Sequence, residues 1–300
     1  MRELPPAPLW ELSIERTRAA HTIQAGAGQL WPITSAMRRF RRNQPLQFRT
    51  DTLAQLAGST SWKLVTVNPA LRVSLDQRAI LHGVVFGDGA YHRQAAGSGR
   101  QPFCQVYLCN DPNGCDSRQL APLFEASGYR PVVREDKQQV RFYGLPAGWK
   151  TLPSASESAS YLRGIIAGWF AADGHVDSRS PLAILTCAKR APLEWLQQVA
   201  PRAGLAVSTQ IGLRRSHTTF GPGEWYSLGI AASTLDMAFF ILADKRARSR
   251  PAQFVKAWKI VSARPLQMVE PVYSATTACG HFTIEGNILV VSAHDREALP

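Results

Sequence analysis

The sequence predicts an α+β protein that contains two similar halves. A helix ending in Asp-Gly occurs twice, at Asp88 and Asp173, and a similar order of elements follows each copy. The 300 residues are 45% hydrophobic and 19% charged, which is sufficient for a folded core and excludes disorder over most of the chain. A repeat of about 85 residues is too long for a solenoid unit and suits a duplicated domain.

The first half begins at a helix start signal. Ser74 and Gln77 form the S-x-x-Q pattern of a capping box, and the apolar segment behind it runs to Gly89. Asp116 is the expected cap of a second helix. The strand, helix and hairpin expected after the first helix cover residues 102–108, 117–127 and 131–143.

The second half follows a Pro/Ser-rich linker over residues 153–158, which also offers helix caps. Its first helix is expected over residues 161–174. A strand, a helix, two strands and a helix then follow, expected over 182–188, 193–200, 207–213, 225–230 and 234–245.

Both Asp-Gly helices carry two small residues one turn apart on one face. A glycine within a helix costs about 1 kcal/mol relative to alanine, and small residues allow two helix backbones to approach closely. We therefore expect the two helices to pack along a seam of Gly83, Gly87, Gly168 and Ala172. If they are parallel, Asp88 and Asp173 emerge together at one end.

Two adjacent carboxylates repel each other unless a positive charge neutralises them, and Mg²⁺ prefers such oxygen ligands. Metal held between carboxylates, beside a basic surface, is suited to phosphodiester hydrolysis. A purely structural C-cap is the alternative for one Asp-Gly end. The matched second copy favours a functional site.

Residues 81–89 and 166–174 both resemble the LAGLIDADG motif of homing endonucleases, with His82 and Phe86 departing from its pattern. The flanking elements resemble that family's αββαββα fold over residues 74–262. The resemblance implies a monomeric, site-specific endonuclease whose two curved sheets lie along the major groove of double-stranded DNA. A cleavage-inactive nucleic-acid-binding or maturase-like RNA-splicing factor, or a protein-splicing element, is the alternative.

The resemblance also implies the site residues. Asp88 and Asp173 fall on the family's metal-binding and catalytic positions, with Gly87 and Ala172 beside the metal. The implied cofactor is Mg²⁺, which Mn²⁺ or Ca²⁺ can replace in binding. Basic residues near the metals are expected to be Lys150 and Lys245, with Lys137 and Lys189 as alternatives. For any one of these lysines, the alternative to a catalytic role is a phosphate contact or a solvated side chain.

The charge of the chain favours a polyanionic partner. It has 34 Lys and Arg against 22 Asp and Glu, a formal net charge of +12, and an isoelectric point near 9.9. The candidate DNA contacts are Arg38, Arg39, Arg41, Arg42, Lys137, Lys189, Arg190, Arg214 and Arg215.

A second resemblance lies at the ends of the chain. Residues 272–276 and 281–291 resemble the last strands of an intein's Hint splicing domain, and residues 30–33 and 50–53 resemble its N-terminal part more faintly. Splicing requires an N-terminal Cys or Ser and a C-terminal His-Asn, whereas the chain has Met1 and Val291-Ser292. The resemblance therefore implies a degenerate remnant; an unrelated hairpin is the alternative.

These interpretations predict four regions. A Hint-like N-terminal segment with the basic cluster spans 1–73, the LAGLIDADG halves span 74–153 and 154–264, and the Hint-like strands span 265–300. The N-terminus has no apolar signal region, and no apolar run approaches the ~20 residues of a membrane span. The chain has five cysteines, an odd number that cannot all form disulfides within it. The spacing of Cys104, Cys109 and Cys115 is not that of a zinc site. We expect a cytoplasmic protein, associated with the nucleoid through DNA.

Overall fold

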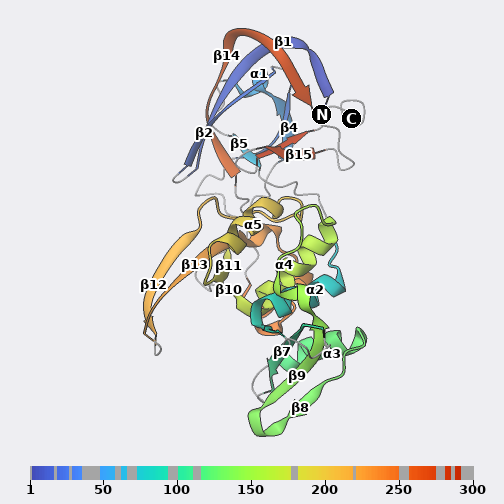
Figure 1. The fold of residues 1–300 in the computed structure, drawn as a ribbon. Coiled ribbons are helices and arrows are strands. Elements are labelled where there is room, and N and C mark those ends of the chain that lie inside the picture. Colours follow the sequence, from blue (N-terminus) through green and yellow to red (C-terminus); the bar gives the residue numbers. More distant parts are fainter. Residues whose placement is uncertain are drawn as a thin grey trace. The chain divides into compact units, whose positions relative to one another are not determined.

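The computed structural model describes residues 2–16, 19–26, 29–35, 48–57, 62–65, 73–93, 101–110, 116–176, 182–218, 221–249, 257–274, 281–284 and 288–291. The chain forms two compact units (Figure 1). One combines Met1–Leu71 with Gln253–Pro300, and the other is Arg72–Ala252. The second unit is thus inserted, in the sequence, between two segments of the first.

The first unit has an antiparallel sheet in the order β2-β1-β14-β5-β3-β4. In chain order its elements are β1 (Arg2–Arg16), β2 (Ala19–Gly26), β3 (Leu30–Ser35), β4 (Phe48–Thr52), α1 (Leu53–Leu56), β5 (Trp62–Val65), β14 (Ala257–Ser274), β15 (His281–Ile284) and β16 (Ile288–Val291). β15 and β16 form a hairpin. The core of the first unit includes Leu12, Trp31, Leu64, Ile260 and Val290. The segments before and after the inserted unit therefore contribute to one fold.

The boundary expected at residue 264 falls inside β14. This strand pairs with β1 and β5, which belong to the first unit. The inserted unit therefore ends at Ala252 and does not extend to residue 264.

The inserted unit contains two halves with the same order of elements, which confirms the α+β fold class. The first half comprises α2 (Gln77–Asp88), β6 (Ala90–His92), β7 (Phe103–Cys109), α3 (Asp116–Ala126), β8 (Val132–Arg134), β9 (Gln139–Pro146) and the short helix η2 (Ala147–Lys150). The helix η1 (Glu135–Lys137) lies at the tip of the β8–β9 hairpin. The sheet order is β6-β7-β9-β8.

The second half repeats this arrangement. It comprises α4 (Ala159–Asp173), β10 (Gly174–Val176), β11 (Leu182–Cys187), α5 (Ala191–Val199), β12 (Gly212–Thr218), β13 (Gly221–Ala231), η3 (Ala232–Thr234), η4 (Met237–Phe239) and α6 (Ala243–Arg248). The sheet order is β10-β11-β13-β12, which matches that of the first half.

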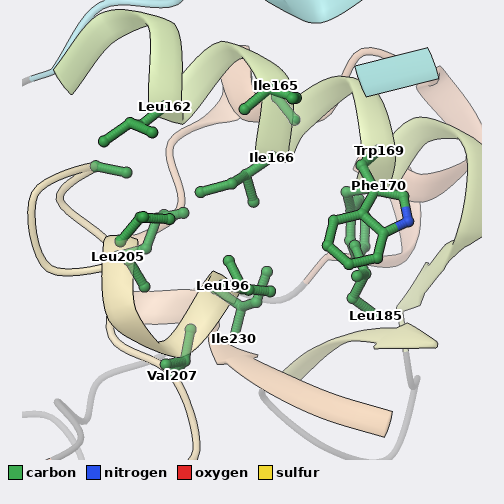
Figure 2. Close-up of a cluster of buried hydrophobic side chains, with 14 of the residues drawn as sticks. Leu162, Ile165, Ile166, Trp169, Phe170, Leu185, Leu196, Leu205, Val207 and Ile230 are labelled. Carbon is green, nitrogen blue, oxygen red and sulfur yellow. The ribbon is translucent and has the colours of Figure 1, made fainter. Parts of the chain in front are cut away.

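Each half has its own hydrophobic core. In the second half, Ile166 and Phe170 of α4 pack with Leu196 of α5 and with Leu185 and Ile230 of the sheet (Figure 2). In the first half, α2 and α3 pack on β7 and β9, with the rings of Phe124 and Phe142 stacked 4.7 Å apart. The helices thus cover one face of each sheet.

Two local expectations, a helix cap and the start of a strand, were wrong, and two short strands were missed. α2 is capped by Asp76, whose carboxylate accepts from the Ala79 N–H, instead of by Ser74. The strand expected from residue 207 begins at Gly212, and Val207 makes only an isolated bridge with Ile230. The strands β6 and β10 were not predicted from the sequence; each has three residues.

The helix expected over residues 234–245 is instead two short 3₁₀ turns and α6. Phe239 and Phe240 enter the core of the second half, whereas Leu242 enters that of the first. Phe240, Ile241 and Leu242 lie between η4 and α6, where the chain is not helical.

Candidate active site

Helices α2 and α4 pack through their glycines. A Cβ built on Gly168 would overlap the carbonyl oxygen of Ile80, and one built on Gly83 would overlap that of Ile165. The two contacts are equivalent under the internal repeat, because each glycine lies three residues beyond the isoleucine that its counterpart touches. The seam therefore has local two-fold character and leaves no space for a side chain at either glycine.

The close approach continues to the C-terminal ends of the helices. A Cβ on Gly87 would lie 2.5 Å from the Cβ of Ala172 and 3.2 Å from Oδ2 of Asp173. The structure thus places all four expected seam residues at the α2–α4 interface. Asp88 and Asp173 are the last residues of the two helices.

The two carboxylates share one electrostatic environment. Desolvation raises the pKa of Asp88, and repulsion from Asp173 raises it further. Desolvation also raises the pKa of Asp173, while a hydrogen bond from Trp169 and the charges of Lys150 and Lys245 lower it. The surface of Asp88 is nevertheless exposed and that of Asp173 half-buried. The pair therefore forms a solvent-accessible site where added positive charge is favourable.

One lysine lies at the C-terminal end of each helix. Nζ of Lys150 donates to the carbonyl oxygens of Val85, Phe86 and Gly87 at 3.3, 2.6 and 3.0 Å. Nζ of Lys245 donates to those of Phe170, Ala171 and Ala172 at 3.0, 2.6 and 3.5 Å. In both helices these are the three residues that precede the aspartate. We call each arrangement a lysine clamp.

The carbonyls of Val85 and Phe170 also accept from the backbone N–H of Gly89 and Gly174. The lysine clamps add donors to the later carbonyls, which a helix leaves without intrahelical partners at its C-terminus, and they oppose the negative end of its dipole.

Burial lowers the pKa of both ammonium groups. Asp173 and Asp88 partly offset this for Lys150, and Asp244 and Asp116, followed by Asp88 and Asp173, partly offset it for Lys245. Lys150 and Lys245 therefore lie at the helix ends that carry Asp88 and Asp173, and their charges lower the pKa of both carboxyl groups. The alternatives Lys137 and Lys189 are exposed, in η1 and in the bend before α5.

The donor set suits a hard divalent cation, which binds carboxylate and carbonyl oxygens. Among the described residues, no group of three or more His, Cys, Asp and Glu side chains lies together as a metal site. A cation at Asp88 and Asp173 would therefore take its other ligands from water or phosphate. The carbonyls of Gly87 and Ala172, expected beside the metal, already accept from the lysine clamps.

Sequence reasoning missed the role of His82, a buried residue of α2. Its Nε2 lies 2.8 Å from the Thr151 carbonyl and its Nδ1 2.9 Å from the Tyr161 hydroxyl. The carbonyl can only accept, so Nε2 carries the proton and Nδ1 accepts from Tyr161. His82 thereby ties α2 to α4 and to the segment next to Lys150. A polar residue within an apolar motif was the available signal.

The sheet faces opposite the helices carry cationic and aromatic side chains. In the first half, Tyr107 pairs with Arg141 across β7 and β9, and the guanidinium lies 4.6 Å from the ring centroid. In the second half, Arg214 pairs with Trp225 across β12 and β13. Arg141 was missed, although its alternation with buried Val140 and Phe142 indicated the exposed face.

The structure separates the expected DNA contacts. Arg214 lies on the helix-free face of its sheet, whereas the adjacent Arg215 lies on the other face and pairs with Glu224 at 2.7 Å. Arg190 pairs with Glu194 at 2.8 Å. The cluster of Arg38, Arg39, Arg41 and Arg42 lies outside the described residues. No helix in the described part of the chain is long and apolar enough to cross a membrane.

No protein-family model and no curated protein matches the chain. The solved structures that match it include variants of the homing endonuclease I-DmoI and the N-terminal LAGLIDADG domain of DUF199/WhiA. One is I-DmoI in complex with DNA and Ca, with 16% identity, a TM-score of 0.37, and coverage of 52% of this chain and 82% of that one. Another is full-length DUF199/WhiA from Thermatoga maritima, with 12% identity, a TM-score of 0.33, and coverage of 58% and 57%. At these values the likeness carries no functional argument.

Proposed function

We propose that the chain is a site-specific double-strand DNA endonuclease that acts as a monomer. The observation that carries the proposal is the two-fold matching of Asp88 and Asp173. Each ends a helix of the glycine seam, and each follows three carbonyls held by a lysine clamp. Two acidic centres at matching positions of the internal repeat suit the cutting of two strands by one chain.

In this proposal, Asp88 and Asp173 hold divalent cations, with Mg²⁺ as the natural ion and Mn²⁺ or Ca²⁺ able to replace it in binding. A cation bound there would polarise the scissile phosphate and lower the pKa of an attacking water. Lys150 and Lys245 hold the helix ends in place and keep positive charge where negative charge develops on the phosphate.

The helix-free sheet faces are the proposed DNA-binding surface. Arginine side chains contact phosphates or base edges, and aromatic neighbours limit their motion. Arg141 is held in this way by Tyr107 and by Oε1 of Gln139, which accepts from Nε and Nη2 at 3.2 and 2.9 Å. The net charge of +12 supplies the general attraction to DNA.

A second candidate is a nucleic-acid-binding protein of the same fold that does not cut. The observation favouring it is the small number of candidate metal ligands: two carboxylates, with the adjacent carbonyls engaged by lysines.

The first unit is proposed as a degenerate Hint scaffold. Its support is that β1 and β14, which precede and follow the inserted unit in the sequence, pair with each other in one sheet.

The deciding experiment has two stages. Wild-type protein is incubated with Mg²⁺ and a library of duplex sites, and the ends produced are sequenced. Asp88→Asn and Asp173→Asn are then tested on the site found, with Glu125→Gln on the exposed face of α3 as the matched control. We expect both aspartate variants to lose double-strand cleavage and retain binding in a gel-shift assay, while the control cuts normally. Binding without any cleavage by the wild type would favour the second candidate.

A further inference from the structure

We propose that Trp169 is a positioning residue that fixes the Asp173 carboxylate, so that the two halves of the candidate site are chemically unequal. The consequence for DNA cutting rests on the proposed function, whereas the positioning itself does not. Indole Nε1 of Trp169 donates a hydrogen bond of 2.9 Å to Oδ2 of Asp173. The two residues are four apart on α4 and so share one helix face.

The indole ring is itself held in place. Trp169 is fully buried, and its ring packs edge-to-face against Phe86 of α2 with centroids 5.0 Å apart. It lies at the edge of the hydrophobic cluster formed by α4 and the sheet (Figure 2). A donor that cannot turn fixes the orientation of the carboxylate that accepts from it.

The residue of the first half that corresponds to Trp169 makes no such bond. The internal repeat aligns Trp169 with Val84, whose side chain cannot donate a hydrogen bond. The lysine clamps, by contrast, are matched in the two halves. Among these aligned features, the difference between the two centres is therefore the indole donor.

This difference has a physical consequence. Asp173 presents Oδ1 in a fixed orientation because Oδ2 is engaged, whereas Val84, which corresponds to Trp169, offers Asp88 no such donor. Partners that orient a ligand side chain commonly change affinity or activity by about 10- to 100-fold when they are mutated. The centre at Asp173 is therefore preorganised, and the two DNA strands are cut at unequal rates.

The positioning is tested without metal or DNA, by NMR of protein labelled with ¹⁵N-tryptophan. The indole N–H signal of Trp169 is assigned from its loss in Trp169→Phe. In Asp173→Ala we expect this signal to move upfield and to exchange faster with solvent. The indole of Trp195, which donates to the Pro153 carbonyl at 3.0 Å, is the internal reference and should not change. An unchanged Trp169 signal in Asp173→Ala would overturn the proposal.

The unequal rates are tested on a supercoiled plasmid carrying the cleavage site. Trp169→Phe keeps the buried ring and removes the donor, and Trp195→Phe removes a comparable bond away from the carboxylates. In Trp169→Phe we expect cutting of one strand to slow by about tenfold, so that nicked circles accumulate. Trp195→Phe should cut like the wild type. Both strands cut at wild-type rates in Trp169→Phe would contradict the proposal. A wild type that cuts neither strand would contradict the proposed function alone, since the NMR result stands independently.

Discussion

Gly168 lies directly against the carbonyl group of Ile80, in an approach that a methyl group would block. The equivalent contact has Gly83 of α2 against the carbonyl group of Ile165 of α4. The glycines therefore determine how close α2 and α4 approach, and this determines where the aspartates at their ends lie. In this way the seam connects local sequence to the geometry of the candidate site.

The seam predicts that Gly168→Ala destabilises the inserted unit. Its Cβ would overlap backbone atoms, which cannot move as a side chain could. Overpacking of this kind costs about 1–3 kcal/mol, and the free energy of unfolding from urea titration should fall by that amount. Gly148→Ala is the control, because its Cβ would meet nothing within 4 Å. Equal stability of the two variants would show that α2 and α4 do not pack through Gly168.

The lysine clamps predict that Lys150→Met and Lys245→Met weaken both stability and cleavage. Each variant keeps an apolar stem of similar length and loses an ammonium group that bonds three carbonyls. Bonds from charged groups contribute about 1.5–3 kcal/mol each, and partial exposure reduces this, so we expect a loss of about 1–3 kcal/mol.

Lys189→Met is the matched control for the clamps. Lys189 is exposed, so its substitution should change the unfolding free energy by less than about 0.5 kcal/mol. If all three lysine variants unfolded at the same urea concentration as the wild type, the clamps would have no stabilising role.

The order of elements in the two halves was predictable because its signals are local. Small residues one turn apart, caps and alternating strands are read within a few residues, and the repeat confirms them. The hydrogen bond between Trp169 and Asp173 could also have been predicted from the sequence, because a spacing of four residues places both side chains on one helix face.

Other features depend on contacts between distant residues. The bonds of His82 join residues 69 and 79 positions apart in the sequence, and Leu242 packs into the core of the opposite half. No periodicity near these residues encodes such partners. The prediction of a single helix over residues 234–245 was wrong, and this segment contributes to both cores.

Buried His82 predicts that stability falls in mild acid. Burial lowers its pKa below the usual 6.5, so the folded state keeps it neutral while the unfolded state binds a proton. Its stabilising contribution is complete above pH 6.5 and is lost as the pH falls toward the lowered pKa. The charged and titratable groups that act on it are Arg78, Glu157 and Tyr161. The unfolding free energy should fall by up to about 1.4 kcal/mol per pH unit.

The test compares the wild type with His82→Gln in urea titrations at pH 7.5 and 5.5. Gln lacks a titrating ring, so the difference between the two pH values should be smaller in the variant. An identical pH dependence in the wild type and in His82→Gln would show that His82 does not titrate with unfolding.

The helix-free sheet face predicts that Arg141 contributes to DNA affinity. Its guanidinium is held by Tyr107 and Gln139, so little side-chain entropy is lost when it binds. Arg141→Ala should weaken binding to the cognate duplex by about 1–3 kcal/mol. Arg215→Ala is the matched control, because Arg215 lies on the opposite face of its sheet and is paired with Glu224. Binding is measured by fluorescence anisotropy at fixed salt, since phosphate contacts make affinity salt-dependent. If Arg215→Ala weakened binding as much as Arg141→Ala, the assignment of the DNA-binding face would be wrong, because general charge loss would explain both results.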